Sequence, residues 1–283
     1  MKALSLILPH QLFKQSPVLS VDRPVVMIEE SLFFNQYAFH KQKIAFMRGS
    51  MRAYCDRLIE LGYTVTYIEA HEQASDVRIW LSESIKNGLS KLYLFDPVDN
   101  WLERRIKAFS ADVDLCWLES PAFLNSKKEL STFFKPSKKK FFQTSFYQSE
   151  RQRRQILMTA ATPDGGQWSF DAENRQKFPK NAAVPKIHWP EESAYHREAE
   201  QYVAQYFSQN LGAIDSAFVY PLDHNAAELW LEDFLTFRFK FFGHYEDALV
   251  SQEHLLHHSL LSPLINVGLL SPNLVLDRVL AYA

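Results

Sequence analysis

The first strand-like segment of the chain is Leu4-Ser5-Leu6-Ile7-Leu8, followed by Pro9-His10-Gln11, and it indicates the fold class. A short, nearly continuous apolar run that ends at a proline and two polar residues is typical of a strand buried on both faces. Four more runs of this kind precede residue 120, each bounded by Pro, Asp, Gly or Glu: Val25–Ile28, Val65–Ile68, Leu92–Phe95 and Leu115–Leu118. We expect these five runs to form a parallel sheet.

Segments with helical spacing lie between these runs. In Ile44–Leu61 apolar residues recur every three or four positions, and Gly62 follows as a C-terminal cap. Val77–Ile85 and Trp101–Phe109 predict two shorter helices. Strands that alternate with helices predict an α/β domain over residues 1–120, with a Rossmann-like open parallel sheet and right-handed crossovers.

In such a sheet, ligands usually bind beyond the carboxyl ends of the strands, where the strand order reverses. The residues at those ends are Pro9-His10-Gln11, Glu29-Glu30 and Asp96-Pro97. No G-x-G-x-x-G follows the first strand, and the chain contains no P-loop. The sequence therefore argues against a nicotinamide dehydrogenase and against a P-loop ATPase.

The second half of the chain has a different pattern. Prolines and an Asp164-Gly165-Gly166 turn signal punctuate residues 121–190, which we interpret as an interdomain linker with one helix at Tyr147–Met158. Residues 191–283 are interpreted as the start of an all-α domain, with too few helices for an independent core. We therefore expect a truncated domain, in a fragment or a naturally shortened protein. The expected helices are Ala194–Phe207, Asn225–Phe242, Tyr245–Leu256, one starting within Leu264–Leu269, and Pro272–Ala281.

Length and composition exclude several classes of protein. A chain of 283 residues predicts about two domains, and 47% hydrophobic with 23% charged residues excludes disorder and collagen. The chain has no apolar stretch long enough to cross a bilayer, and no signal-peptide cleavage site follows the first strand, so we expect no membrane association. Cys55 and Cys116 are too few for a disulfide framework, and core packing is the better interpretation of both. We expect a reduced, cytoplasmic protein.

The net charge of the chain is only -2, but one segment of it is strongly basic. Nine basic and only two acidic residues lie between Lys127 and Arg154, and phenylalanines are interleaved with them. Such a segment is typical of a site for a polyanion such as DNA, and a solvated helix face and loop is the alternative. The candidate DNA-binding residues are Lys138, Lys139, Lys140, Arg151, Arg153 and Arg154.

Two other patterns are considered as a metal site and as a catalytic carboxylate pair, and neither is supported. His254, His257 and His258 have the spacing of metal ligands on a helix, but no acidic or cysteine partner stands at a matching distance, so we predict no metal site. Asp171 and Glu173 would point apart on a helix, so they do not form a catalytic carboxylate pair. We interpret the block around them as structural linker.

Three stretches together resemble one family. They are Phe39–Tyr54, the block Gly165-Gly166-Gln167-Trp168-Ser169-Phe170-Asp171-Ala172-Glu173-Asn174-Arg175, and His258–Leu270. They resemble the photolyase-related proteins, the branch of the cryptochrome/photolyase family that holds the iron–sulfur bacterial cryptochromes and the prokaryotic (6-4) photolyases. The similarity covers essentially the whole chain in order. It implies the N-terminal portion of such a protein.

The resemblance implies a flavoprotein that uses light either to repair UV-damaged DNA, as a carbon–carbon lyase of the deoxyribodipyrimidine photolyase type, or to sense blue light. The complete protein would bind FAD and DNA, and a damaged base would be reached by flipping it out of the duplex. The segment around His258–Ser262 would help to hold the FAD phosphates. The FAD-binding candidates are His258, Ser259, Leu260, Leu261, Ser262 and Tyr245.

The resemblance also implies an antenna pocket at the strand ends, with Pro9, His10, Gln11 and Glu29 as candidates. Relatives that bind a ribityl lumazine usually carry Gly-Asp-Gln where this chain has Pro9-His10-Gln11, so retention of a lumazine-type antenna and its loss are both open. The four cluster-binding cysteines of relatives lie mainly beyond the matched region, and Cys55 and Cys116 do not correspond to them. We predict no iron–sulfur cluster in this chain.

Two hypotheses from other classes stay open beside the photolyase hypothesis. The basic segment, with its interleaved aromatic residues, would also suit a non-catalytic nucleic-acid-binding module. The strand ends would also suit an α/β protein that binds a small ligand or nucleotide without photochemistry.

Overall fold

The computed structural model describes residues 2–214 and 220–283. The chain divides into two compact units. The first unit combines Met1–Leu124, Ile187–Asp233 and Leu260–Ala283, and the second combines Asn125–Lys186 and Phe234–Ser259. Each unit thus joins segments that are distant in the sequence. The division at residues 120 and 190 that we drew from composition stays a prediction.

The sheet of the first unit contains the five predicted strands, and all of them are parallel. Their order is β3-β2-β1-β4-β5. β1 and β2 are buried along most of their length, whereas the side chains of the edge strands β3 and β5 are mostly half-buried or exposed. The expectation of burial on both faces therefore fails at the edges. The strands are β1 (Lys2–Ile7), β2 (Val25–Ile28), β3 (Val65–Ile68), β4 (Leu89–Phe95) and β5 (Asp114–Leu118).

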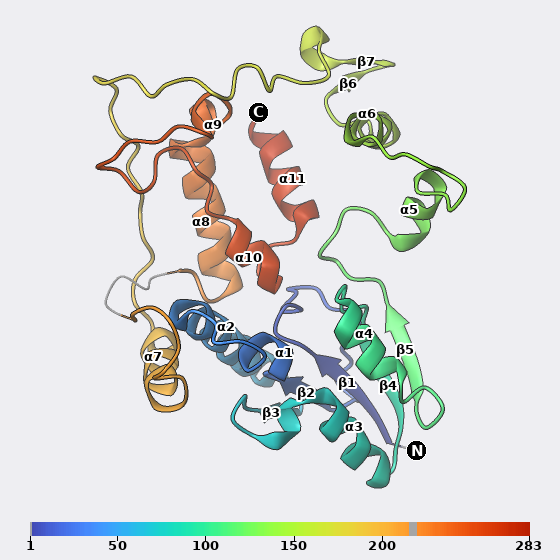
Figure 1. Ribbon diagram of the computed structural model, residues 1–283. Helices are drawn as coiled ribbons and strands as arrows, with labels where there is room; N and C mark the ends of the chain where they lie inside the picture. Colours follow the sequence, from blue (N-terminus) through green and yellow to red (C-terminus); the bar gives the residue numbers. More distant parts are fainter. Residues whose placement is uncertain (1, 215–219) are drawn as a thin grey trace. The chain divides into compact units, whose positions relative to one another are not determined.

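Helices cover both faces of this sheet. α3 (Val77–Lys86) and α4 (Asn100–Lys107) lie on one side of the strands, and α2 (Lys41–Glu60) lies on the other (Figure 1). Leu4, Leu6 and Leu8 alternate along β1 and its end, and they pack into one cluster with apolar side chains of α3 and α4. Two short elements complete this region, α1 (Ser31–Phe34) and the 3-10 turn Gln73–Ser75.

The end of α2 is formed as the sequence predicts. Gly62 adopts a left-handed conformation with φ +87°, and its N–H donates to Ile59 O. Tyr63 N then donates to Leu58 O, which satisfies a second carbonyl of the last turn. A side chain at position 62 would be strained in this conformation, so the glycine fixes where the helix stops.

Later segments of the chain also belong to the first unit. α7 (Ala194–Tyr206) packs against α2. α8 (His224–Phe237) begins in this unit and ends in the second, and α10 (Ser262–Val267) and α11 (Pro272–Tyr282) complete the first unit. Among the described residues no helix is both long and apolar enough to cross a membrane.

The second unit is built from short elements. A capping box starts its first helix, because the Ser126 hydroxyl accepts from Glu129 N and the Glu129 carboxylate accepts from Ser126 N. The elements are α5 (Lys127–Phe133), α6 (Gln143–Arg154), the hairpin strands β6 (Met158–Thr159) and β7 (Thr162–Pro163), the 3-10 turn Asp164–Gly166, and α9 (Phe239–Tyr245).

Three helix predictions in the second half are wrong. The helix expected at Asn225–Phe242 is broken at Arg238, between α8 and α9. The helix expected at Tyr147–Met158 starts earlier and ends at Arg154, because Gln155 turns left-handed with φ 54°. The helix expected at Tyr245–Leu256 is absent beyond its first residue, and turns with a bridge between Val250 and Glu253 take its place.

Candidate functional site

A cavity of about 610 Å³ lies in the first unit at the carboxyl ends of β1 and β4. The strand order reverses there, because β2 and β3 extend the sheet on one side of β1 whereas β4 and β5 extend it on the other. The loops that leave β1 and β4 therefore diverge and leave a crevice. Pro9 and His10 line it from the first loop, and Pro97, Val98 and Asp99 line it from the second.

His10 forms a flat wall of this cavity. Its ring stacks on Phe33 of α1 with 4.7 Å between centroids and 20° between planes. His10 Nε2 lies 2.8 Å from Pro97 O, and since a carbonyl only accepts, Nε2 carries the proton. Burial lowers the pKa of His10 to about 4, against the weaker opposing effects of Pro97 O and Asp99, so the ring is neutral at physiological pH. His10 Nδ1 is left as a buried acceptor, with no hydrogen-bond partner among the described residues.

The rim of the cavity carries an unusual backbone conformation. Val98 has φ 48°, and its N–H donates to Asp96 Oδ1 over 2.9 Å. A β-branched residue in the left-handed region costs roughly 1–3 kcal/mol and persists only where the surroundings hold it. Such conformations cluster at binding sites, which agrees with the position of Val98 in the cavity lining.

The start of α2 also lines the cavity. His40 caps this helix, because its Nδ1 accepts from Gln42 N over 3.2 Å. Lys41 N donates to Leu211 O, and Gly212, with φ +83°, lies so close to His40 that a Cβ would sit 1.9 Å from Nε2. A segment far away in the sequence thus fixes the cavity wall that His40 and Lys43 provide.

The third stretch of the family resemblance supplies another wall. Pro263, Asn266 and Val267 of α10 line the cavity. Val267 O accepts from Leu12 N over 2.9 Å, and Gly268 follows with φ +91°. A Cβ at Gly268 would approach the Phe13 ring to 2.9 Å, so glycine is needed for α10 to dock against the loop after β1.

A buried ion-pair network lies at the carboxyl ends of β2 and β3, and the sequence reasoning missed it. Arg48 of α2 is 3% exposed and pairs with Glu29 at 3.1 Å, Glu69 at 3.0 Å and Glu198 of α7 at 2.6 Å. Its guanidinium also lies 3.9 Å from the ring centroid of Tyr202. The sequence does show a charged residue, Arg48, among the apolar positions of Ile44–Leu61, which is unusual for a buried helix face. The sequence does not indicate which carboxylates pair with it.

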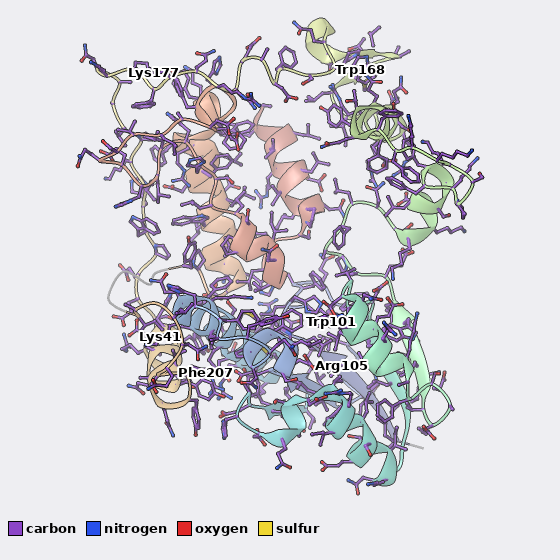
Figure 2. All side chains as sticks on the ribbon, in the orientation of Figure 1. Lys41, Trp101, Arg105, Trp168, Lys177 and Phe207 are labelled. Carbon is purple, nitrogen blue, oxygen red and sulfur yellow. The ribbon has the colours of Figure 1, made fainter. Side chains whose placement is uncertain are left out.

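Glu29 is fully occupied by this network. Its carboxylate accepts from Tyr67 OH over 2.6 Å, from Ala70 N over 2.8 Å and from Arg48 over 3.1 Å. Burial raises the pKa of Glu29, although Arg48 and the other donors act to lower it. The neighbouring Glu30 is also fully buried, and it pairs at 3.4 Å with Arg105 of α4, which is labelled in Figure 2.

The four antenna candidates therefore occupy different places. Pro9 and His10 line the cavity, whereas Gln11 and Glu29 are not among its lining residues. Gln11 is buried, and its Oε1 accepts from Leu8 N over 3.3 Å within the turn that follows β1. Gln11 and Glu29 thus make local structural contacts, and a role for either in an antenna pocket stays a prediction.

The six FAD candidates are divided between the two units. Tyr245, His258 and Ser259 belong to the second unit, and Leu260–Ser262 belong to the first. Tyr245 packs in an aromatic cluster with Phe178 and His257 at centroid distances of 5.2 and 5.5 Å. The six candidates therefore do not all belong to one unit, and none of them lines the cavity at the strand ends.

The DNA-binding candidates separate into two groups. Lys138, Lys139 and Lys140 are exposed, and Lys138 Nζ lies 3.7 Å from the Phe133 ring centroid. Arg153 is engaged by Glu129 at 2.6 Å and by Glu150 at 2.7 Å. Arg154 also contacts Glu150, at 3.4 Å. The lysines are therefore the candidates with charge directed to solvent.

Arg151 differs from the other five candidates because it is buried. It is 7% exposed, and its guanidinium donates to Ile156 O over 3.2 Å and to Leu157 O over 2.6 Å. These carbonyls lie just beyond the C-terminus of α6, where the chain turns through left-handed residues. A side chain buried on backbone carbonyls holds this turn, and its position does not favour the predicted contact with DNA.

The histidines considered for metal binding are not arranged on a helix. His257 is buried and its Nδ1 lies 3.1 Å from Arg238 O, whereas His254 is exposed. In the described part of the chain, no group of three or more His, Cys, Asp or Glu side chains is placed to hold a metal ion.

Comparisons with known proteins identify the family of this chain. The model of the deoxyribodipyrimidine photo-lyase-related protein family matches residues 5–219. An uncharacterized protein of Acanthamoeba polyphaga mimivirus is 34% identical over 197 residues, which are 65% of this chain and 99% of the viral protein. A (6-4) photolyase of Agrobacterium fabrum is 29% identical over 283 residues, or 95% of this chain. The matched part is 55% of that photolyase, so this chain spans about half of its length.

Proposed function

Because the chain belongs to the deoxyribodipyrimidine photo-lyase-related protein family, we propose that it is part of a light-dependent flavoprotein that repairs UV-damaged DNA. Its α/β unit would hold the light-harvesting chromophore of that protein. The observation that carries the proposal is the cavity at the carboxyl ends of β1 and β4. Blue-light sensing by the same kind of protein is the alternative, and the cavity suits both.

The cavity has the properties that a chromophore needs. Its volume of about 610 Å³ falls within the roughly 300–1,000 Å³ typical of cofactor sites. The His10–Phe33 stack offers a flat surface to a conjugated ring, and Phe46 and Tyr220 add two more rings to the lining. A neutral His10 adds no charge beside an aromatic ligand.

FAD and DNA enter the proposal through the complete protein. FAD would supply the light-driven electron transfer, and the segment His258–Ser262 with Tyr245 is where we expect this chain to contribute to its site. The exposed Lys138–Lys140 would contact DNA phosphates. No iron–sulfur cluster is assigned to this chain.

The first test is an absorption and fluorescence spectrum of the purified chain, with acid release of any bound chromophore. A blocking variant, Asn266→Trp, places a large side chain on α10 at a position that lines the cavity. Ile265→Trp changes the adjacent residue, which does not line it. We expect a lumazine or flavin added to the chain to be retained by the wild type and by Ile265→Trp but not by Asn266→Trp. Equal retention by all three would overturn the assignment of the chromophore to this cavity.

A non-catalytic nucleic-acid-binding function is a second candidate. It is favoured by the exposed lysines at 138–140 together with two exposed rings, Phe141 at 51% and Phe142 at 61%. Binding of a fluorescent oligonucleotide at several salt concentrations tests it. Lys139→Ala and Lys140→Ala should each lower, by about one, the slope of the logarithm of the binding constant against the logarithm of the salt concentration. Lys177 is an exposed lysine elsewhere in the second unit, and Lys177→Ala should leave this slope unchanged. Strong flavin-free binding without preference for irradiated DNA would favour this candidate over the photolyase.

Ligand binding without photochemistry is a third candidate. It is favoured by the composition of the cavity, because all of its lining residues belong to the first unit. A ligand could therefore bind there without any residue of the second unit, which carries the basic segment. Retention of a small ligand, with no affinity for DNA at low salt, would favour this candidate.

A further inference from the structure

We propose that the cavity at the strand ends takes a phosphorylated heteroaromatic ligand, and that Lys43 is the residue that selects the phosphate. The inference rests on the proposed function, because it names the class of ligand for the same cavity. It goes further by assigning a charge to that ligand and one side chain to its recognition.

Two oppositely charged side chains line this cavity, and only one of them is compensated. Asp99 caps α4, with its Oδ1 accepting from Leu102 N over 2.7 Å. The positive end of the α4 dipole therefore stabilises this carboxylate. Lys43 lies in the first turn of α2, where the helix dipole disfavours a cation.

Lys43 has no carboxylate partner among the described residues. Its Nζ rests 3.8 Å from the ring centroid of Phe39, and no ion pair of the described chain includes it. The first turn of α2 contains no acidic residue. Lys43 is exposed, so a ligand can reach its ammonium, and desolvation by the surrounding groups lowers its pKa. This wall of the cavity therefore carries a solvated positive charge that is not paired with a carboxylate of the described residues.

The backbone at the start of α2 does not supply the anion site. Lys41 N donates to Leu211 O and Gln42 N donates to His40 Nδ1, so these amides are already used. The side chain of Lys43 is what remains to meet an anion. An ammonium is a compact charge suited to phosphate, and a phosphate monoester carries close to two negative charges at neutral pH.

The rest of the lining selects a flat ring. The His10–Phe33 stack and the Phe46–Tyr220 pair, whose centroids are 6.0 Å apart, surround the same cavity that Lys43 lines. A ligand with a heteroaromatic ring and a phosphate on a short chain satisfies these features. Flavin mononucleotide and a mononucleotide such as AMP are two sources of this chemistry.

Matched ligand pairs test the inference directly. Binding of FMN and riboflavin is measured by quenching of flavin fluorescence, and binding of AMP and adenosine by calorimetry, to the wild type and to Lys43→Met. We expect the phosphorylated member of at least one pair to bind about tenfold tighter, and Lys43→Met to remove that preference. A preference confined to the FMN pair identifies a flavin-type ligand, and one confined to the AMP pair identifies a nucleotide.

Two further variants make the result specific to Lys43. Lys43→Arg keeps the charge and should keep the preference for phosphate. Lys41, labelled in Figure 2, lies in the same turn but does not line the cavity. Lys41→Met therefore removes a nearby charge and should change the affinity for the phosphorylated ligand less than about twofold. Thermal unfolding of each variant confirms that it is folded.

The outcomes separate this inference from the proposed function. Binding of the two members of each ligand pair with equal affinity would overturn the inference and leave the chromophore cavity in place. An equal loss of affinity in Lys41→Met and Lys43→Met would also overturn it, because the general field of the helix end would then account for binding. Failure of all four ligands, and of lumazine, to bind would overturn both.

Discussion

Replacing Arg48 by methionine should destabilise the first unit strongly. The substitution keeps much of the apolar stem but removes the cation that pairs with the fully buried Glu29 at 3.1 Å. Breaking a buried ion pair from one side typically costs about 3–5 kcal/mol, because the remaining charge stays desolvated. Glu69 and Glu198 are 29% and 40% exposed, so water compensates the loss of their pairs and they add little.

The pH dependence of this effect identifies Glu29 as its source. The pKa of Glu29 is raised in the folded protein, so the folded state holds a proton over a pH range in which the unfolded state has lost it. The free energy of unfolding therefore falls as pH rises from about 4.5 through the raised pKa. Without Arg48 that pKa rises further, so the destabilisation in Arg48→Met should be largest near pH 8 and smaller near pH 5.

Urea unfolding followed by circular dichroism, at pH 5 and pH 8, measures both effects. Glu198→Gln is the control, because it removes one partner at the exposed side of the network and should cost less than about 1 kcal/mol. The double variant Arg48→Met/Glu29→Gln should recover at least about 2 kcal/mol, because no buried charge is then left unpaired. A loss in Arg48→Met below about 1 kcal/mol, or an equal loss at both pH values, would refute the reasoning.

Three further predictions concern single residues. Gly268→Ala should lower the free energy of unfolding, measured by thermal unfolding, by roughly 1–3 kcal/mol, because φ is +91° and a Cβ would lie 2.9 Å from the Phe13 ring. Gly243→Ala is the control: this glycine lies within α9 with open space around it, so the substitution should be neutral or slightly stabilising. Arg151→Met should loosen the turn after α6, because the guanidinium no longer donates to the carbonyls there. Amide hydrogen exchange at residues 155–168 should then be faster, and unchanged exchange would contradict the structural role of Arg151. Burial lowers the pKa of His224 to about 4 in the folded protein. The free energy of unfolding should therefore fall as pH falls from 6.5 to about 4, because only the unfolded state takes up the proton. His224→Gln should flatten this part of the plot of unfolding free energy against pH, and an unaltered slope would exclude His224 as a cause.

The α/β part of the fold could be predicted well from the sequence. Its strands are short apolar runs and its helices have apolar residues at regular spacing, and both signals depend on neighbours within a few residues. The later helices were predicted less well for the same reason. Tyr245–Leu256 has helical spacing, but the chain forms turns there, and Arg238 breaks the segment before it. Apolar spacing alone does not distinguish a helix from a segment of turns, such as the one that the bridge between Val250 and Glu253 closes here.

The candidate site was predicted in part. The rule that ligands bind beyond the strand ends pointed to Pro9, His10 and Pro97, and all three line the cavity. It also pointed to Glu29, whose carboxylate is instead taken up by Arg48, Tyr67 and Ala70. A residue's position after a strand predicts that it is near the site, whereas its hydrogen-bond partners decide whether it is available there.

Local residue order was enough to specify the parallel sheet, the cap at Gly62 and the family, because each depends on residue types at short, fixed spacing. The packed fold was needed to show which strand ends adjoin each other and which segments complete the cavity. Lys43, Val98 and Asn266 line one space although they come from three segments that lie far apart along the chain. Such contacts depend on strand order and on the docking of α10 at Gly268. No local pattern encodes them, because many distant pairings are compatible with the same helices and strands.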